Sequence, residues 1–178
     1  MRPPLQEDAA EQVTLKPGEL HFTREPAIIR TLLGSCIAIT LWHPRRRIGG
    51  MCHYLLTERS QYERARRHPA GYYATDAVSY FLSQAKANGC RPGEFEAKLF
   101  GGGNMFDGIQ ERLGSINVAR VNAAEGRRLL EHSGFAIKAA DVGGSRYRKV
   151  HFDLSSGFVW VQYGGRRAAS LTLGDNRK

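Results

Sequence analysis

The stretch from Thr31 to Tyr54, TLLGSCIAITLWHPRRRIGGMCHY, decides the fold of this 178-residue chain. Its short apolar runs are rich in Ile and Leu and are interrupted by Gly and Pro, a pattern that is typical of β-strands joined by turns. We therefore expect a hairpin with one strand over 37–42, a turn over His43–Arg46 and a returning strand over 48–56.

The register of this hairpin brings a thiol and an imidazole together. A hairpin centred on the Pro44–Arg45 bond places Cys36 directly opposite His53. Directly opposite residues share a face of the sheet, with their Cβ atoms about 4.5–5.5 Å apart. The sequence thus predicts a Cys–His pair on one face of the hairpin.

The opposite face of the hairpin is expected to be core. It carries Ile37, Ile39, Leu41, Ile48, Gly50 and Cys52. Because neighbouring strand residues point to opposite faces, Cys52 cannot join Cys36 and His53 around a metal ion. We interpret Cys52 and Cys90 as structural, and we expect neither a metal nor a cofactor.

A thiol beside an imidazole is a nucleophile and its base. The histidine is expected to lower the pKa of Cys36 and to supply the thiolate that attacks a carbonyl carbon. Gly34 and Ser35 allow a tight turn that presents the sulfur and leaves N–H groups for a developing oxyanion. The residues also permit a plainer alternative, a buried structural cysteine, which is the commoner state of a cysteine in a strand.

The composition is that of one globular domain with a basic surface. Hydrophobic residues make up 42% of the chain, and 26 Lys and Arg against 17 Asp and Glu give a formal net charge of +9. Such a surface attracts acidic proteins, acidic membranes or nucleic acid, and charge alone does not choose among them. No apolar run is long enough to span a bilayer, and the first residues lack the apolar core of a secretory signal. We expect a cytoplasmic protein without membrane insertion.

The remaining pattern predicts a single α+β or mixed α/β domain, with largely antiparallel sheet layers and two main helices packed on one face. We expect a flexible tail over 1–12, a folded domain over 13–165 and a second tail over 166–178. The expected elements are strands between 13 and 56, a loop over 60–72, a helix capped by Thr75 and ended by Gly89, a strand over 95–100, a helix over 117–133 closed by Gly134, and strands over 135–142, 149–154 and 158–163.

A run of glycines follows the strand over 95–100. It lacks the spacing and the final Lys-Ser/Thr of a phosphate-binding loop. We interpret this run either as a close approach of the backbone to neighbouring strands or as the rim of an active site, for which Gly102 and Asn104 are the candidates. Asp141, which precedes Gly143–Gly144, either shapes the same rim or forms a turn.

Four ordered blocks of this sequence resemble the chemoreceptor glutamine deamidases of bacterial chemotaxis, the CheD family. They are LGSCIAITL over 33–41, RRIGGMCHYLL over 46–56, KLFGGGNMF over 98–106 and ADVGGS over 140–145 with its continuation to 152. The resemblance extends from about residue 15 to residue 163. It implies conversion of glutamine side chains in receptor signalling helices to glutamate, with release of ammonia and without a cofactor.

The resemblance also implies site residues. The family's Cys–His pair carries over to Cys36 and His53, at the family's spacing. The family's threonine does not carry over directly, because its position holds Arg30, and Thr31 is the candidate one residue closer to the cysteine. A second departure is Ile116, which stands where many members have an arginine.

Three functions follow from these observations as hypotheses. The first is a cysteine-dependent protein-glutamine deamidase acting on chemoreceptor helices. The second is a non-catalytic adaptor, since the resemblance also implies binding to a chemotaxis phosphatase. The third, a basic nucleic-acid binder, is disfavoured because the aromatic residues near the C-terminus are explained equally well by sheet packing.

Overall fold

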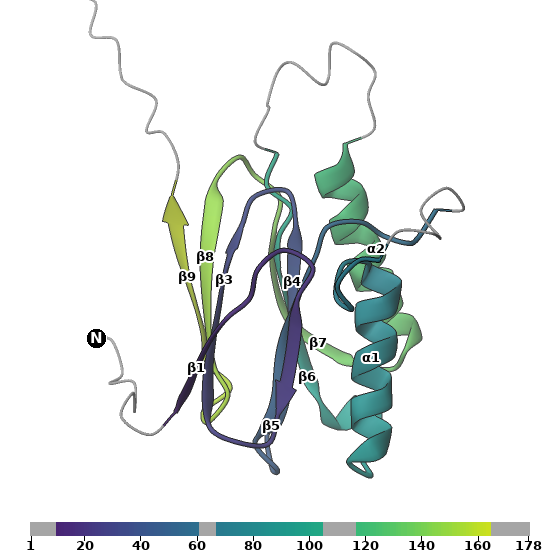
Figure 1. Ribbon diagram of the computed structural model, residues 1–178, viewed down its shortest axis with the longest axis vertical. Helices are drawn as coiled ribbons and strands as arrows, with labels where there is room; N and C mark the ends of the chain where they lie inside the picture. The colour runs from purple at the N-terminus through teal and green to yellow at the C-terminus, as the bar shows by residue number, and fades with distance from the viewer. Residues whose placement is uncertain (1–9, 61–66, 105–116, 165–178) are drawn as a thin grey trace, which may run out of the picture.

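The strands and helices of the chain form three layers: a four-stranded sheet, a five-stranded sheet and a pair of helices (Figure 1). The computed structural model describes residues 10–60, 67–104 and 117–164. The strands are β1 (Glu11–Thr14), β2 (Leu20–Thr23), β3 (Ala27–Leu33), β4 (Ile37–His43), β5 (Ile48–Tyr54), β6 (Glu96–Gly101), β7 (Ala136–Val142), β8 (Tyr147–Asp153) and β9 (Val159–Gly164). The helices are α1 (Ala74–Ala87), α2 (Val118–His132) and a short 3-10 turn, η3 (Pro92–Glu94).

The predicted hairpin exists as β4 and β5, but its register differs from the prediction. His53 pairs with Ala38 rather than with Cys36. The connection is a four-residue loop over 44–47, in which Arg47 adopts a left-handed backbone with φ of 53° and its N–H donates to the His43 carbonyl at 2.8 Å. The prediction that Cys36 lies directly opposite His53 is therefore wrong, and the two residues are diagonal neighbours on one face.

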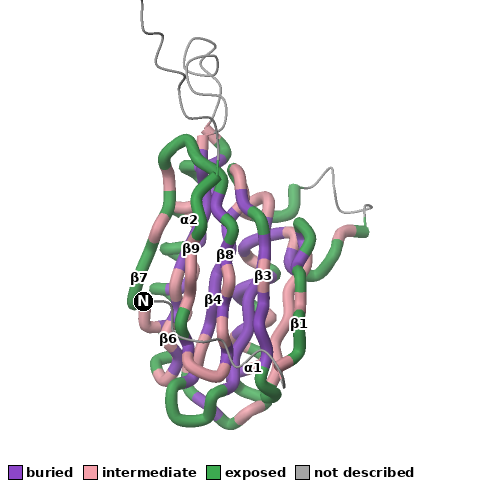
Figure 2. Tube along the Cα trace, turned by 90° about the vertical axis from the view of Figure 1, so that its left-hand side faces the viewer, coloured by how far each residue is buried: buried purple, intermediate pink, exposed green. Residues whose placement is uncertain are grey.

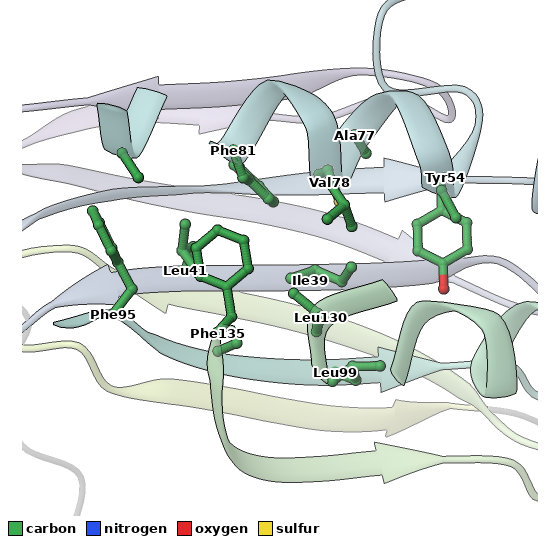
Figure 3. Close-up of a cluster of buried hydrophobic side chains, with 14 of the residues drawn as sticks. Ile39, Leu41, Tyr54, Ala77, Val78, Phe81, Phe95, Leu99, Leu130 and Phe135 are labelled. Carbon is green, nitrogen blue, oxygen red and sulfur yellow. The ribbon is translucent and has the colours of Figure 1, made fainter. Parts of the chain in front are cut away.

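The assignment of the two faces is confirmed, because the register is displaced by two residues and an even displacement keeps every side chain on its face. Ile39, Leu41 and Cys52 belong to the cluster under the helices. Figure 3 shows Ile39 and Leu41 beneath Phe81 of α1. The intervening residues of the hairpin pack between the two sheets, in a cluster of Leu15, Ala27, Ile29, Leu33, Ala38, Met51, Phe100, Val150, Phe152 and Leu154.

The single α+β domain and its largely antiparallel pairing are confirmed. The sheet orders are β1-β3-β8-β9 and β2-β5-β4-β6-β7, and within the described ranges only the pairs β1–β3 and β6–β7 are parallel. The helices cover one face of the five-stranded sheet, while its other face packs against the four-stranded sheet. The central strands β3 and β4 are mostly buried, whereas β7 and β9 at the edges are largely accessible (Figure 2).

The prediction that Thr75 caps the first helix is wrong. Tyr73 precedes the first helical residue and makes no capping bond. The backbone of the preceding segment takes over this role, because the N–H groups of Ala74 and Thr75 donate to the carbonyls of Leu56 and Thr57 at 2.9 and 3.1 Å. These bonds satisfy donors that a helix N-terminus otherwise leaves without a partner.

The ends of the second helix agree with the prediction. The Asn117 side chain accepts a hydrogen bond from the Arg120 N–H at 3.0 Å, and Gly134 follows the helix with φ of +81°. Asn117 thus has a capping role in this fold.

Some expectations fall on residues whose structure is not described. These are residues 1–9, part of the loop over 60–72, Met105, Phe106, Ile116 and the tail over 166–178. Glu11 and Gln12, which were expected in the first tail, lie in β1 and pair with β3. In the described part of the chain no helix has the length and apolarity that a membrane span requires.

Candidate active site

A buried threonine and a buried histidine meet between the two sheets. Thr31 on β3 and His53 on β5 place Oγ1 and Nδ1 2.7 Å apart, and both residues are less than 5% exposed. The backbone of His53 is fixed as well, since its N–H donates to the Glu19 carbonyl at 2.9 Å and its carbonyl accepts from the Gly18 N–H at 2.8 Å. The imidazole therefore has little freedom to turn.

The hydrogen bonds around Thr31 select one tautomer of His53. The Thr31 hydroxyl donates its single hydrogen to the Leu15 carbonyl at 2.9 Å, so it must accept at its contact with Nδ1. His53 consequently carries its hydrogen on Nδ1 and a lone pair on Nε2. The Nε2 atom is buried, and it has no hydrogen-bond partner among the described residues. This is the state that a general base requires.

The alternation of β3 explains why Thr31, and not Arg30, meets the histidine. Successive strand residues point to opposite faces. Thr31 points between the sheets, whereas the Arg30 side chain donates to His151 Nδ1 at 3.3 Å. The candidate threonine thus reaches the imidazole although it stands one residue from the family's position.

Cys36 lies in the turn that connects β3 to β4. It is half-buried and packs against the cluster between the sheets, which also contains Ala38, the residue paired with His53. Thiol and imidazole therefore lie on the same face of the hairpin, as the sequence predicted, although they are two residues apart along the strand. The half-buried position also leaves part of Cys36 accessible from outside.

The protonation states differ from those that the sequence suggested. Burial raises the pKa of the Cys36 thiol above its ordinary value, and a hydrogen bond from the Ser35 side chain opposes this only in part. Burial lowers the pKa of His53 to about 4, against a smaller opposing effect of Glu19. The expectation that histidine lowers the pKa of the thiol is wrong for this resting state, in which both groups are neutral at pH 7.

The glycine-rich loop braces the cysteine turn. The N–H groups of Gly102 and Gly103 donate to the carbonyls of Cys36 and Gly34 at 2.9 and 2.8 Å, and the Asn104 N–H donates to the Gly144 carbonyl at 2.7 Å. A side chain at Gly101 would place its Cβ 2.2 Å from the Cys36 carbonyl oxygen, so only glycine fits there.

These bonds decide which N–H groups are free for an oxyanion. Those of Gly102 and Asn104 are already engaged, so the backbone of these two residues supplies neither oxyanion donors nor a phosphate cradle. The N–H groups of Ser35 and Cys36, in contrast, donate to no backbone carbonyl within the ranges that the structure covers. A cavity of about 270 Å³ adjoins the glycine-rich loop and is lined by Gly102, Asn104, Asn117, Arg120, Ala123, Val142, Gly143 and Gly144.

Metal-ligand types gather at one other place in the described part of the chain. Potential ligand atoms of His43, Cys90 and Glu94 lie within 4.8 Å of one another. The group stands at the far end of β4 from Cys36, and the Glu94 carboxylate already accepts from the Arg91 N–H at 2.6 Å. Arg91 and Arg46 also act on this carboxylate electrostatically, and such positive charge disfavours a cation.

The low pKa of His53 makes folding stability depend on pH. Between pH 6.5 and about 4 the unfolded chain binds a proton on His53 that the folded protein does not bind, so stability falls as the pH falls through this window. Relative to the variant His53→Asn, the wild type should lose about 3 kcal/mol of unfolding free energy between pH 7 and pH 4. Urea unfolding of both proteins across this range measures the difference. Parallel curves would contradict the buried neutral imidazole.

The sequence of this chain is similar to those of proteins of bacterial chemotaxis. Residues 55–163 match the family model described as "CheD chemotactic sensory transduction". The chain is 48% identical over 152 residues to the "Probable chemoreceptor glutamine deamidase CheD 3" of Dechloromonas aromatica, covering 85% of this chain and 87% of that protein. It is 42% identical over 154 residues to the "Probable chemoreceptor glutamine deamidase CheD" of Pseudomonas fluorescens, covering 85% and 84%. The crystal structure of the hypothetical protein YfiH of Bacillus licheniformis aligns with a TM-score of 0.46 at 10% identity, covering 79% of this chain and 62% of that one.

Proposed function

The chain belongs to the CheD family, and from this premise we propose that it deamidates glutamine side chains in the signalling helices of chemoreceptors. The observation that carries the proposal is the line from the Leu15 carbonyl through Thr31 to His53 Nδ1, which leaves Nε2 as a base on the face of Cys36. Two relatives that match most of the chain carry names that state this activity.

We propose that acylation begins from the neutral pair. As the Cys36 sulfur attacks the carboxamide carbon of the substrate, the thiol proton passes to His53 Nε2. The carbonyl oxygen becomes an oxyanion, for which the N–H groups of Ser35 and Cys36, which have no backbone acceptor among the described residues, are the donors. The carbon–nitrogen bond then breaks, the proton on Nε2 leaves with the nitrogen as ammonia, and a thioester remains on Cys36.

Deacylation reverses these proton transfers. A water molecule gives a proton to Nε2 and adds to the thioester carbon, the carbon–sulfur bond breaks, and the proton returns to sulfur. The products are the original thiol and a carboxylic acid, which releases its proton to water and becomes glutamate. The raised pKa of Cys36 suits this cycle, because a thiol that stays protonated until the substrate arrives is less exposed to oxidation.

Thr31 acts through His53 in this scheme, as a positioning residue. Thr31→Val removes the acceptor of the Nδ1 hydrogen, and loss of one buried hydrogen bond costs about 1–3 kcal/mol. We expect kcat to fall on the order of 10- to 100-fold with KM little changed. Thr31→Ser should restore most of kcat, while Thr40→Val, at another buried threonine, should leave kcat unaltered. Equal kcat in Thr31→Val and the wild type would refute the role.

The proposal is tested with a cytoplasmic receptor fragment from the same organism. The purified protein is incubated with the fragment, and the peptides are examined by mass spectrometry for conversion of Gln to Glu together with ammonia release. We expect conversion at a few defined glutamines. As a control, the deamidase of a relative should modify the same folded fragment. If it does and this protein leaves the fragment unmodified, the proposed function is rejected.

The proposal extends to partners and location. Receptor signalling helices are the substrate, and the basic surface provides a field that attracts acidic helices. A cytoplasmic location agrees with such a substrate. Binding to a chemotaxis phosphatase, which the family resemblance implies, stays a prediction that co-purification with that phosphatase tests.

A further inference from the structure

A buried arginine stands behind the glycine-rich loop. Arg148 on β8 is 5% exposed, and its Nη2 donates to Asp141 Oδ1 at 2.9 Å and to the Gly143 carbonyl at 2.8 Å. Its Nε and Nη1 atoms are buried and have no hydrogen-bond partner among the described residues. The guanidinium also lies over the Tyr163 ring, with its central carbon 5.6 Å from the ring centroid, so its other two nitrogens have an aromatic face nearby but no hydrogen-bond acceptor. Burying a charge with unused donors is costly, and apolar residues of similar volume often give a core equal stability.

The ion pair joins the two sheets near the cysteine turn. Arg148 belongs to the four-stranded sheet, where it pairs with Leu33, the last residue of β3 before the turn that holds Cys36. Asp141 belongs to the five-stranded sheet, where it pairs with Phe100 beside the glycine run. Asp141 also accepts a hydrogen bond from the Tyr163 hydroxyl of β9. The Asp141 carboxylate thus binds side chains from β8 and β9, two strands of the opposite sheet.

From this pair a chain of hydrogen bonds leads to Cys36. Arg148 holds the Gly143 carbonyl, and the Gly143 N–H donates to the Gly101 carbonyl at 2.9 Å. The next residue of that loop, Gly102, donates to the Cys36 carbonyl at 2.9 Å. Gly101, Gly102 and Gly143 all have positive φ, so their backbone path is one that other residues rarely follow, and it needs fixed partners to persist.

We propose that Arg148, together with Asp141, is a positioning residue of the deamidase, which fixes the glycine-rich loop and through it the Cys36 turn. The inference rests on the proposed function. An apolar side chain could fill the space that Arg148 occupies. Only the guanidinium can bind the Gly143 carbonyl and the Asp141 carboxylate at the same time, and the proposed role explains why a charge is buried here. The N–H groups of Ser35 and Cys36 are aimed correctly only if the turn that carries them is held from behind.

The test compares Arg148→Met with Arg128→Met, which removes an exposed ion pair to Glu125 on α2. Asp141 is about one-third exposed on its side chain, so water can hydrate its carboxylate once the guanidinium is gone. We expect Arg148→Met to lower kcat on the receptor fragment 10- to 100-fold with KM nearly unchanged, and to shift the amide resonances of Gly102 and Gly103. Arg128→Met should leave kcat and these resonances as in the wild type.

A substrate-free readout separates the two hypotheses. An inactive wild type refutes the proposed function, whereas the positioning role is still measured by the glycine resonances and by the alkylation rate of Cys36 with chloroacetamide. A folded Arg148→Met protein with wild-type kcat, resonances and alkylation rate overturns the positioning role. If Arg148→Met does not fold, Arg148→Lys decides by the same measurements, since it keeps the charge and loses the fork.

Discussion

Deamidation of the receptor fragment should be lost when Cys36 is replaced by serine. The hydroxyl is a far weaker nucleophile toward a carboxamide, and removal of a nucleophile from a catalytic group costs about 10⁴-fold in kcat or more. Because Cys36 is half-buried in a turn and serine is nearly isosteric with it, the fold should persist. Ammonia release by the purified variant measures the activity, and circular dichroism with a thermal melt measures the fold.

Cys90→Ser is the matched control for this substitution. Cys90 is buried in the cluster under the helices, remote from the face of Cys36 and His53. Its replacement should leave ammonia release near that of the wild type. Ammonia release by Cys36→Ser at the wild-type rate would show that the sulfur takes no part in the reaction.

The second large effect is expected at His53. His53→Asn keeps a polar atom near the position of Nδ1 and removes the base at Nε2, so kcat should fall on the order of 10²- to 10⁴-fold. The wild type should also keep its activity down to an unusually low pH. Since the pKa of His53 is about 4, the acid limb of its kcat/KM profile should lie near that value instead of near 6.5.

The pH profile also separates catalysis from packing. A merely structural histidine would leave the profile of His53→Asn with the same acid limb as the wild type, at a reduced rate. An acid limb near 6.5 in the wild type would show that the imidazole is hydrated, and it would contradict the buried base that the fold presents.

The strands and helices that carry the site were predictable, because they depend on the alternation of apolar and polar residues along strands and on the residues that end helices. The alternation of Ile37, Ile39 and Leu41 determines the buried face of β4, and an error of two residues in register leaves that face unchanged. The glycines after the helices stop them where the sequence indicated. The exact partner of His53 was not predictable, because it depends on the left-handed backbone conformation of Arg47 in the loop over 44–47. An arginine gives no indication of that conformation in the sequence.

The chemistry of the site depends on contacts between distant segments, and these left little trace in the sequence. The acceptor that orients Thr31 is the backbone carbonyl of Leu15. Every residue has a backbone carbonyl, so the sequence does not mark this one. The pKa values of Cys36 and His53 depend on the second sheet, whose place over the hairpin the sequence did not indicate. Arg148 stood within a block that resembles the family, but its burial and its bond to the Gly143 carbonyl became visible only in the structure.

The central claim is a glutamyl thioester on Cys36, and neutral hydroxylamine tests it most directly. Hydroxylamine competes with water for a thioester, forming a hydroxamate on the substrate and restoring the thiol. We predict that the wild type, incubated with receptor fragment and hydroxylamine, yields glutamyl hydroxamate at the glutamines that otherwise become glutamate, and that Cys36→Ser yields none. Glutamate formation without any hydroxamate at saturating hydroxylamine would contradict the account, because it would mean that water attacks the carboxamide directly.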